Sequence, residues 1–166
     1  MAQPTRTDLE RFVAEHYPRV VATVAMITGD RQGAPDAVQD ALVGYLAAPP
    51  VQAIGSLPAW ITAVASNRLR DAHRRRAAES RAFAKVGVTP EAVEDAGSLL
   101  DVDLQAALDA LPDRQRRICA LHYLLDLSVD DVAASMGVSP GTVKTQLFRA
   151  RAKLAAALRP GVEAAS

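Results

Sequence analysis

Basic and short polar side chains gather in one part of the sequence, the stretch 128–159, where residue spacing predicts two short helices joined by a tight turn. The second of these helices lacks acids and is rich in cations, which are Lys144, Arg149, Arg151, Lys153 and Arg159. Cations on a helix neutralise phosphates, and short polar side chains between them hydrogen-bond base edges in a major groove. The stretch therefore predicts a DNA-reading helix-turn-helix.

Position along the second helix suggests a role for each of its polar residues. Ser139 fits a helix N-cap and Pro140 the first helical position, so the free amides there favour a phosphate. The side chains expected to reach base edges are Thr142, Lys144 and Thr145. Those expected to hold phosphates are Arg149, Arg151 and Lys153. The alternative is an amphipathic surface helix with solvated arginines.

A second basic segment, residues 67–76, precedes the helix-turn-helix by about fifty residues. Its arginines are Arg68, Arg70, Arg74, Arg75 and Arg76, and its single acid is Asp71. Such charge density on one helix suits a nucleic-acid backbone or the acidic surface of a partner protein. A solvated helix face is the other interpretation.

Apolar spacing predicts that these segments lie in an all-helical protein, because strand alternation is nearly absent. A first helix is expected over 8–28, capped by Thr7 and Glu10, kinked or split at Pro18 and ended by Gly29. Its predicted buried stripe contains Leu9, Phe12, Val13, Tyr17, Val20, Val21, Val24 and Ile27.

Two further helices are expected before the middle of the chain. One runs over 35–48 and buries Val38, Leu42, Tyr45 and Leu46. The prolines and glycine of 49–56 indicate a loop. The next helix begins near Pro58 and continues past Arg76, apolar first and basic afterwards, with Trp60 more suited to the core than to stacking.

Composition places a boundary in the middle of the chain. We expect one small helical domain over 1–80, a linker over 81–98 and a second small helical domain over 99–166. Within the second, helices are expected over 99–111 and 112–126, ahead of the helix-turn-helix. The helix over 112–126 would bury Ile118, Leu121 and Leu125, with Cys119 also on its apolar stripe.

Charge and composition limit the class of protein. The formal net charge is zero, but residues 81–111 hold two basic and six acidic residues, whereas 112–166 hold eight and five. A single cysteine, no apolar stretch of about 18–20 residues and no signal-peptide core predict a cytoplasmic protein without a membrane span. The three histidines lack metal-ligand spacing, so no metal, no cofactor and no catalytic residue is expected.

Two motifs in this order resemble the sigma-70 family of bacterial sigma factors, and specifically its extracytoplasmic-function (ECF) group. The sequences PDAVQDALVGYL (35–46) and LPAWITAVASNRLRDAHRRR (57–76) are similar to the family's region 2, with Trp60, Asn67, Asp71 and Arg74 at its pattern positions. The sequence 111–154 is similar to region 4, including GVSPGTVK followed by RAR. Many members have a glycine near Leu125-Asp126.

The resemblance implies a subunit that directs core RNA polymerase to promoters and helps to melt DNA. Region 4 would read the −35 element as duplex, and region 2 would capture the −10 element as a single strand. The −10 residues would be Asn67, Arg68, Asp71, Arg74 and Arg75, beside a base pocket in loop 49–56. Docking on the coiled coil of the polymerase beta-prime subunit would use Asp36, Gln39 and Asp40. An anti-sigma factor is the expected regulator, with Leu124, Leu125 and Leu127 as a partly exposed site.

Two other classes compete with this interpretation. A stand-alone helix-turn-helix regulator would use 1–80 as a sensor or dimer domain, and would need two-fold symmetry to reach two half-sites. An enzyme would need a catalytic motif, and no H-E-x-x-H, P-loop or G-x-S-x-G is present.

Overall fold

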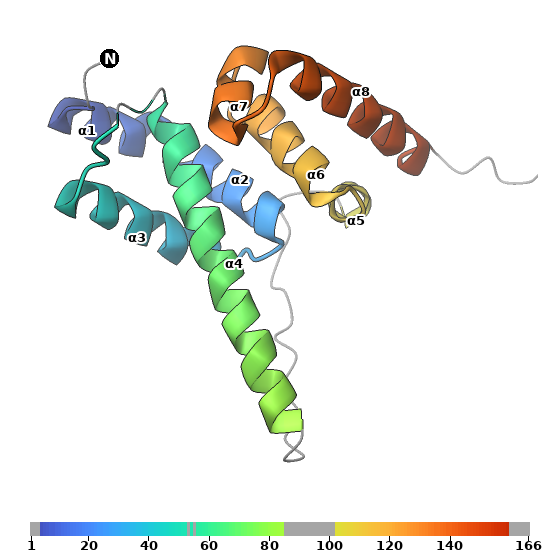
Figure 1. Ribbon diagram of the computed structural model, residues 1–166, viewed down its shortest axis with the longest axis horizontal. Coiled ribbons are helices and arrows are strands. Elements are labelled where there is room, and N and C mark those ends of the chain that lie inside the picture. The colour runs from blue at the N-terminus through green and yellow to red at the C-terminus, as the bar shows by residue number, and fades with distance from the viewer. Residues whose placement is uncertain (1–3, 53, 55, 85–101, 160–166) are drawn as a thin grey trace, which may run out of the picture. The chain divides into compact units, whose positions relative to one another are not determined.

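The computed structural model describes residues 4–52, 54, 56–84 and 102–159, which are helical or loop throughout and contain no strand. They divide into two compact units, one within 1–97 and one within 98–166. The helices of the N-terminal unit are α1 (Arg6–Glu15), α2 (Tyr17–Thr28), α3 (Ala34–Ala47) and α4 (Leu57–Ala84). Those of the C-terminal unit are α5 (Val102–Asp109), α6 (Asp113–Cys119), the π-helical turn η1 (Ala120–Leu124), α7 (Val129–Met136) and α8 (Pro140–Ala157) (Figure 1). The all-helical prediction is confirmed for this part of the chain.

The first predicted helix is split, as Pro18 indicated. Helix α1 ends where the His16 amide donates to the Phe12 carbonyl, and α2 begins with Pro18 in its first turn, where a missing N–H costs nothing. The predicted cap at Thr7 is wrong, because a capping box forms two residues earlier. There the Thr5 amide donates to the Asp8 carboxylate at 2.7 Å. This bond, followed by that from the Thr5 hydroxyl, lowers the pKa of Asp8.

Helices α2, α3 and α4 pack together around the apolar core of the N-terminal unit. Fully buried side chains include Val20, Val24, Ile27, Val38 and Ile61. Each contributes about 1.5–3 kcal/mol relative to an exposed position. Two residues of the predicted core are exposed instead, Val13 by 53% and Leu46 by 65%. The helix breaks at His16, so the buried stripe of α2 does not continue into α1 as far as Val13. Leu46 lies on the outward side of the last turn of α3.

Helix α4 is the longest element of the N-terminal unit and extends well beyond the other helices of that unit (Figure 1). Its first half is buried at Leu57, Ile61 and Leu69, whereas every residue over 74–79 is exposed. It continues to Ala84, four residues past the expected boundary at 80, and most of the expected linker lies outside the described residues. The apolar half of α4 therefore holds the helix while its basic half projects.

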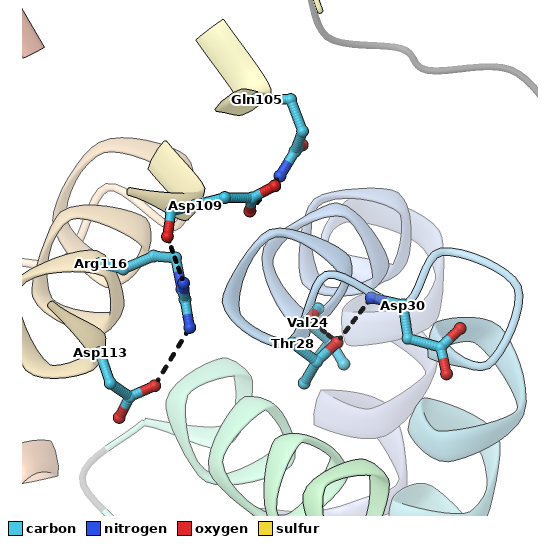
Figure 2. Close-up of polar contacts among 7 residues, drawn as sticks. All are labelled: Val24, Thr28, Asp30, Gln105, Asp109, Asp113 and Arg116. Carbon is cyan, nitrogen blue, oxygen red and sulfur yellow. Dashed lines mark hydrogen bonds and ion pairs between the residues drawn. The ribbon is translucent and has the colours of Figure 1, made fainter. Parts of the chain in front are cut away.

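The turn between α2 and α3 is short and held by several hydrogen bonds. Gly29 has a φ of +72° and ends α2, a left-handed conformation that favours glycine. Figure 2 shows the next contact, in which the Thr28 hydroxyl donates to the Val24 carbonyl at 2.7 Å and accepts from the Asp30 amide at 3.2 Å. These bonds fix Asp30 at the start of the turn.

The C-terminal unit packs α6 and α7 against α8. Ile118, Leu121, Val132, Val143 and Leu147 form its core, and Cys119 is buried as predicted. Burial also raises the pKa of the Cys119 thiol, despite the nearby charge of Arg151.

One arginine joins the first two helices of the C-terminal unit. The Arg116 guanidinium donates to the Asp109 carbonyl and the Asp113 carboxylate, both at 3.3 Å, which joins α5 to α6 (Figure 2). The helix predicted over 112–126 is helical from Asp113 to Leu124, but from Ala120 the chain widens into the π turn η1. Leu125, which was predicted to be buried, follows this turn and is partly exposed. This turn accommodates one residue more than an α turn.

Candidate nucleic-acid interface

The helix-turn-helix begins and ends where its residue types predict. Ser128 caps α7 by accepting from the Asp131 amide at 3.0 Å, and Gly137 ends it with a φ of +66°. Ser139 caps α8 by accepting from the Thr142 amide at 3.1 Å. These caps satisfy amides that would otherwise lack partners and set the direction of α8.

The two threonines of α8 do not have free hydroxyls. The Thr142 hydroxyl lies 2.9 Å from that of Ser139, and the Thr145 hydroxyl donates to the Gly141 carbonyl at 3.0 Å. Thr142 is also half-buried, whereas Lys144 and Thr145 are exposed. Of the three predicted base readers, Lys144 and Thr145 therefore point outward, and Thr142 belongs to the cap.

The outward face of α8 includes an aromatic residue that the sequence prediction missed. The buried side of the helix holds Val143, Leu147 and Ala150. Since successive residues turn by about 100°, Thr145 and Phe148 lie on the opposite side. Phe148 is 69% exposed there. An apolar residue out of phase with the buried stripe was the available signal.

The cations of α8 are not equivalent. Arg149 and Lys153 are exposed. Arg151 is also exposed, but its Nη1 donates to the Tyr123 hydroxyl at 3.1 Å. The sequence prediction did not include Tyr123, because nothing in a spacing pattern links η1 to α8.

The predicted −10 residues lie together on the middle of α4, and all are exposed. Asp71 is partly occupied, because its carboxylate pairs with Arg74 at 3.4 Å and its carbonyl accepts from Arg75 at 3.5 Å. An exposed pair of this kind contributes about 0–1 kcal/mol, so a phosphate can replace it. Arg68 lies across α3, where a side chain at Gly44 would come within 2.9 Å of its guanidinium. Asn67 is exposed beside it.

His73 anchors the basic half of α4, and the sequence prediction missed this role. Its Nε2 lies 2.8 Å from the Asp30 carboxylate. Burial raises the pKa of Asp30, but the hydrogen bonds from His73 and from the Gly33 amide at 2.7 Å outweigh it and hold that pKa below its usual value. A Cβ at Gly33 would lie 2.7 Å from Asp30 Oδ2 and 2.8 Å from Leu69 Cδ2, so a side chain there would displace the Asp30 carboxylate or the end of Leu69.

A cleft of about 540 Å³ lies beside this anchor, and its lining residues are Gly29, Asp30, Arg31, Gln32, Gly33, Asp36, His73 and Arg76. Both signs of charge line it. The cleft lies between the N-terminal turn of α3, at Asp36, and the basic half of α4, at His73 and Arg76.

The predicted docking residues form part of a longer exposed stripe on α3. Asp36, Gln39 and Asp40 are exposed, and the Gln39 amide donates to the Tyr17 hydroxyl at 3.1 Å. At helical spacing from them, Val43 is 61% exposed and Leu46 is 65% exposed. The stripe is therefore acidic at its N-terminal end and apolar at its C-terminal end. The apolar part was missed because Leu46 was expected inside.

Loop 49–56 is described only in part, without residues 53 and 55. Val51 in this loop is fully exposed. Trp60, just beyond the loop, lies edge-on to Tyr45 with ring centroids 5.4 Å apart, an arrangement typical of core aromatics. Trp60, which is half-buried, therefore packs α4 against α3.

Three expectations outside this interface can be compared with the structure. Leu124, Leu125 and Leu127 are partly exposed, as predicted. In the described ranges, no group of three or more His, Cys, Asp or Glu side chains could hold a metal ion. Among the helices of those ranges, none is long and apolar enough to cross a bilayer.

Comparison with known proteins identifies the family. Residues 12–79 match the model of sigma-70 region 2, and residues 101–154 match that of sigma-70 region 4. The chain is 31% identical over 158 residues to the ECF RNA polymerase sigma factor EcfG of Rhodopseudomonas palustris, covering 93% of this chain and 87% of that one. It is 28% identical over 153 residues to the ECF sigma factor SigE of Mycolicibacterium smegmatis, covering 87% and 59%.

Solved structures agree with this match. The sigma factor RpoE in a co-crystal with the anti-sigma factor NepR from Bartonella quintana superposes with a TM-score of 0.72 at 28% identity, covering 93% of this chain and 99% of that one. The fold and paired basic helices therefore define a sigma-70-type transcription factor, and the chain belongs to that family. Within it, the chain is an ECF sigma factor, a non-catalytic subunit with which RNA polymerase initiates transcription. The resemblance drawn from the sequence is confirmed.

Proposed function

We propose that the two units divide promoter recognition, with duplex −35 DNA bound by the C-terminal unit and single-stranded −10 DNA by the N-terminal unit. The observation that carries the proposal is the acid-free outward face of α8, set by serine caps at both helices of the helix-turn-helix. We assign residues 1–84, which end with α4, to region 2. We assign residues 85–98 to the linker and residues 99–166 to region 4.

On the −35 element, Lys144 and Thr145 contact base edges, and Phe148 packs on a thymine methyl group. Lysine reads guanine acceptors, and apolar side chains favour thymine. Arg149, Arg151 and Lys153 bind phosphates. Ser139 and Thr142 lie at the start of α8, whose N-terminal amides bind a further phosphate. The exposure of Lys144, Thr145 and Phe148 on one side of α8 supports these roles.

On the −10 element, the exposed stretch of α4 holds the strand that melting displaces. Arg74 and Arg75 bind its phosphates, and Asn67, Arg68 and Asp71 read bases, with loop 49–56 receiving an extruded base. Extrusion costs a few kcal/mol, which electrostatic binding of the strand offsets. The exposure of these side chains and the weakness of the Asp71 pair support the proposal.

Core polymerase docks along the outward stripe of α3, through the coiled coil of its beta-prime subunit. Asp36, Gln39 and Asp40 supply polar contacts, and Val43 and Leu46 supply the apolar centre that stable interfaces need. The exposure of two large apolar side chains in line with two acids supports this assignment.

An anti-sigma factor regulates the chain by covering surfaces that polymerase would use. The sigma factor RpoE is solved with NepR, and CnrH with the cytosolic domain of CnrY; the latter superposes with a TM-score of 0.63 at 23% identity. The partly exposed Leu124, Leu125 and Leu127 are our candidate contacts on the C-terminal unit.

Run-off transcription tests the whole proposal. Core RNA polymerase is incubated with genomic fragments, with and without this chain, and permanganate then maps unpaired thymines. We expect new transcripts and a melted segment near −10 only when the chain is present. A palindromic footprint formed without polymerase would instead favour a stand-alone regulator.

A further inference from the structure

Tyr123 is an exposed aromatic residue that the functions proposed above leave unused. It lies in η1, just before the loop that leads into the helix-turn-helix, and it is 48% exposed. Its hydroxyl accepts a hydrogen bond from Arg151 Nη1 of α8, 28 positions later in the sequence. A cation expected to bind phosphate is thus held by a neighbouring phenol.

The surroundings of Tyr123 fix its ring. The adjacent His122 ring meets it edge to face, with centroids 4.9 Å apart and planes inclined by 71°. His122 Nδ1 lies 2.8 Å from the Leu127 carbonyl, which can only accept, so Nδ1 carries the proton. The Leu127 amide in turn donates to the Leu121 carbonyl at 3.3 Å.

The loop that closes this network has an unusual backbone. Asp126 adopts a φ of +53°, and aspartate tolerates this left-handed conformation better than most residues. The turn can therefore bring Leu127 back to His122, and the phenol is placed before any ligand arrives.

The Tyr123 hydroxyl and the Arg151 guanidinium both have further hydrogen-bond donors after they pair with each other. A tyrosine hydroxyl that accepts from arginine still has its own O–H to donate. The guanidinium has further N–H donors in a planar fork that suits two oxygens of a phosphate. Arg151 also follows Lys144 by seven residues, two helical turns, so both cations lie along the same side of α8.

We propose that Tyr123 and Arg151 form a clamp for one backbone phosphate of the −35 duplex. The clamp rests on the proposed role of α8 in reading that duplex. Arg151 supplies the charge, and Tyr123 acts as a positioning residue that also donates its O–H. The charge of α8 favours DNA over an acidic protein segment. Lys144 and Arg151 lie two turns apart on one side of the helix, Arg149 and Lys153 add charge elsewhere on it, and the helix holds no acid, so it can contact several phosphates of a duplex.

A double-mutant cycle tests the coupling. Tyr123→Phe keeps the ring and removes the hydroxyl, and Arg151→Gln removes the charge. Holoenzyme made with the full chain is titrated with a promoter duplex recovered by run-off transcription. We expect Tyr123→Phe to weaken binding about three- to tenfold, and to have no effect once Arg151 is glutamine. Unchanged binding in Tyr123→Phe, or additive losses, would overturn the clamp.

Replacing single phosphates by neutral methylphosphonates locates the contact. We expect one −35 position at which replacement weakens wild-type binding but not that of Tyr123→Phe or Arg151→Gln. Arg114→Gln, an exposed neutralisation on α6, should keep the wild-type profile. A profile that is identical in wild type and Tyr123→Phe refutes the clamp, as does a Tyr123→Phe defect confined to binding of a protein partner.

The variant Lys144→Ala distinguishes the clamp from the proposed reading of −35 DNA by α8, on which the clamp rests. If Lys144→Ala weakens duplex binding and Tyr123→Phe does not, the reading role of α8 stands and the clamp falls. If neither variant changes binding, the reading role itself is wrong, and the clamp with it. Thermal unfolding of each variant shows that the difference does not arise from loss of folding.

Discussion

The two basic helices, α4 and α8, present arginines in different ways. On α8 the outward face lacks acids, its start is capped by Ser139, and Arg151 is already held by Tyr123. On α4 the arginines stand beside Asp71 on a projecting half that is tied to the rest of the unit through His73. A duplex has a fixed shape that rewards preset side chains, whereas a melted strand is flexible and tolerates arginines that rearrange. The difference suits one helix to duplex DNA and the other to a single strand.

The largest effect is expected from a change in α3, outside both basic helices. It tests whether the action of α4 and α8 depends on docking to core polymerase. Asp40→Arg places a cation in the acidic part of the α3 stripe and should cost roughly 2–5 kcal/mol of affinity for core polymerase. Co-elution with core polymerase on gel filtration measures it. Glu15→Arg, an equal charge reversal on α1, should assemble normally. Co-elution of Asp40→Arg at wild-type yield would remove α3 from the interface.

The next effect should be confined to α4. Changing Arg74, Arg75 and Arg76 together to glutamine removes three exposed cations, so the salt slope of open-complex formation should fall by about two. Open complexes should form about ten- to a hundredfold less at roughly 0.1 M salt, while −35 binding stays unchanged. Permanganate reactivity over the −10 region is the readout, with Arg11→Gln on α1 as the control. Reactivity equal to wild type would contradict the single-strand role.

A smaller effect is expected on α8, where binding of the −35 duplex should weaken while melting stays unchanged. Lys144→Ala should weaken binding of the −35 duplex by about 1–2 kcal/mol and relax preference at the base it reads, with melting of bound complexes unaffected. Gel shifts with matched and mismatched duplexes measure both changes. An equal loss on every sequence would mean that Lys144 contacts a phosphate rather than a base.

The smallest effect concerns the anchor of α4. The pKa of Asp30 is lowered in the folded chain, so its contribution is present above the ordinary value of 3.8 and is lost as pH falls through the folded pKa. Asp30→Asn should lower the free energy of unfolding by about 1 kcal/mol at about pH 7. The difference from wild type should shrink toward about pH 3. Urea unfolding at both values checks this, and a difference independent of pH would mean that the charge of Asp30 is not involved.

The sequence predicted what local chemistry controls. Serine caps, Gly29, Gly137 and Pro140 mark the ends of α2, α7 and α8 within a few residues. The start of α4 was found from its proline and apolar spacing, but its end at Ala84 was not. Contacts between distant residues left no such signal. Asp30 with His73 and Tyr123 with Arg151 join positions 43 and 28 apart, and depend on how helices pack. Val13 and Leu46 were placed inside because periodicity gives a face but not what covers it.

Because of the π turn at Ala120–Leu124, the number of residues in this segment determines which side chains face α8. The π turn holds one residue more than an α turn, so deleting any one residue there would restore regular α geometry and rotate what precedes it by about 100° relative to α8. A deletion between Cys119 and Tyr123 would therefore change the partner of Arg151 without altering either side chain. Among relatives, a one-residue gap at this place in an alignment would then matter more than many substitutions on the surface.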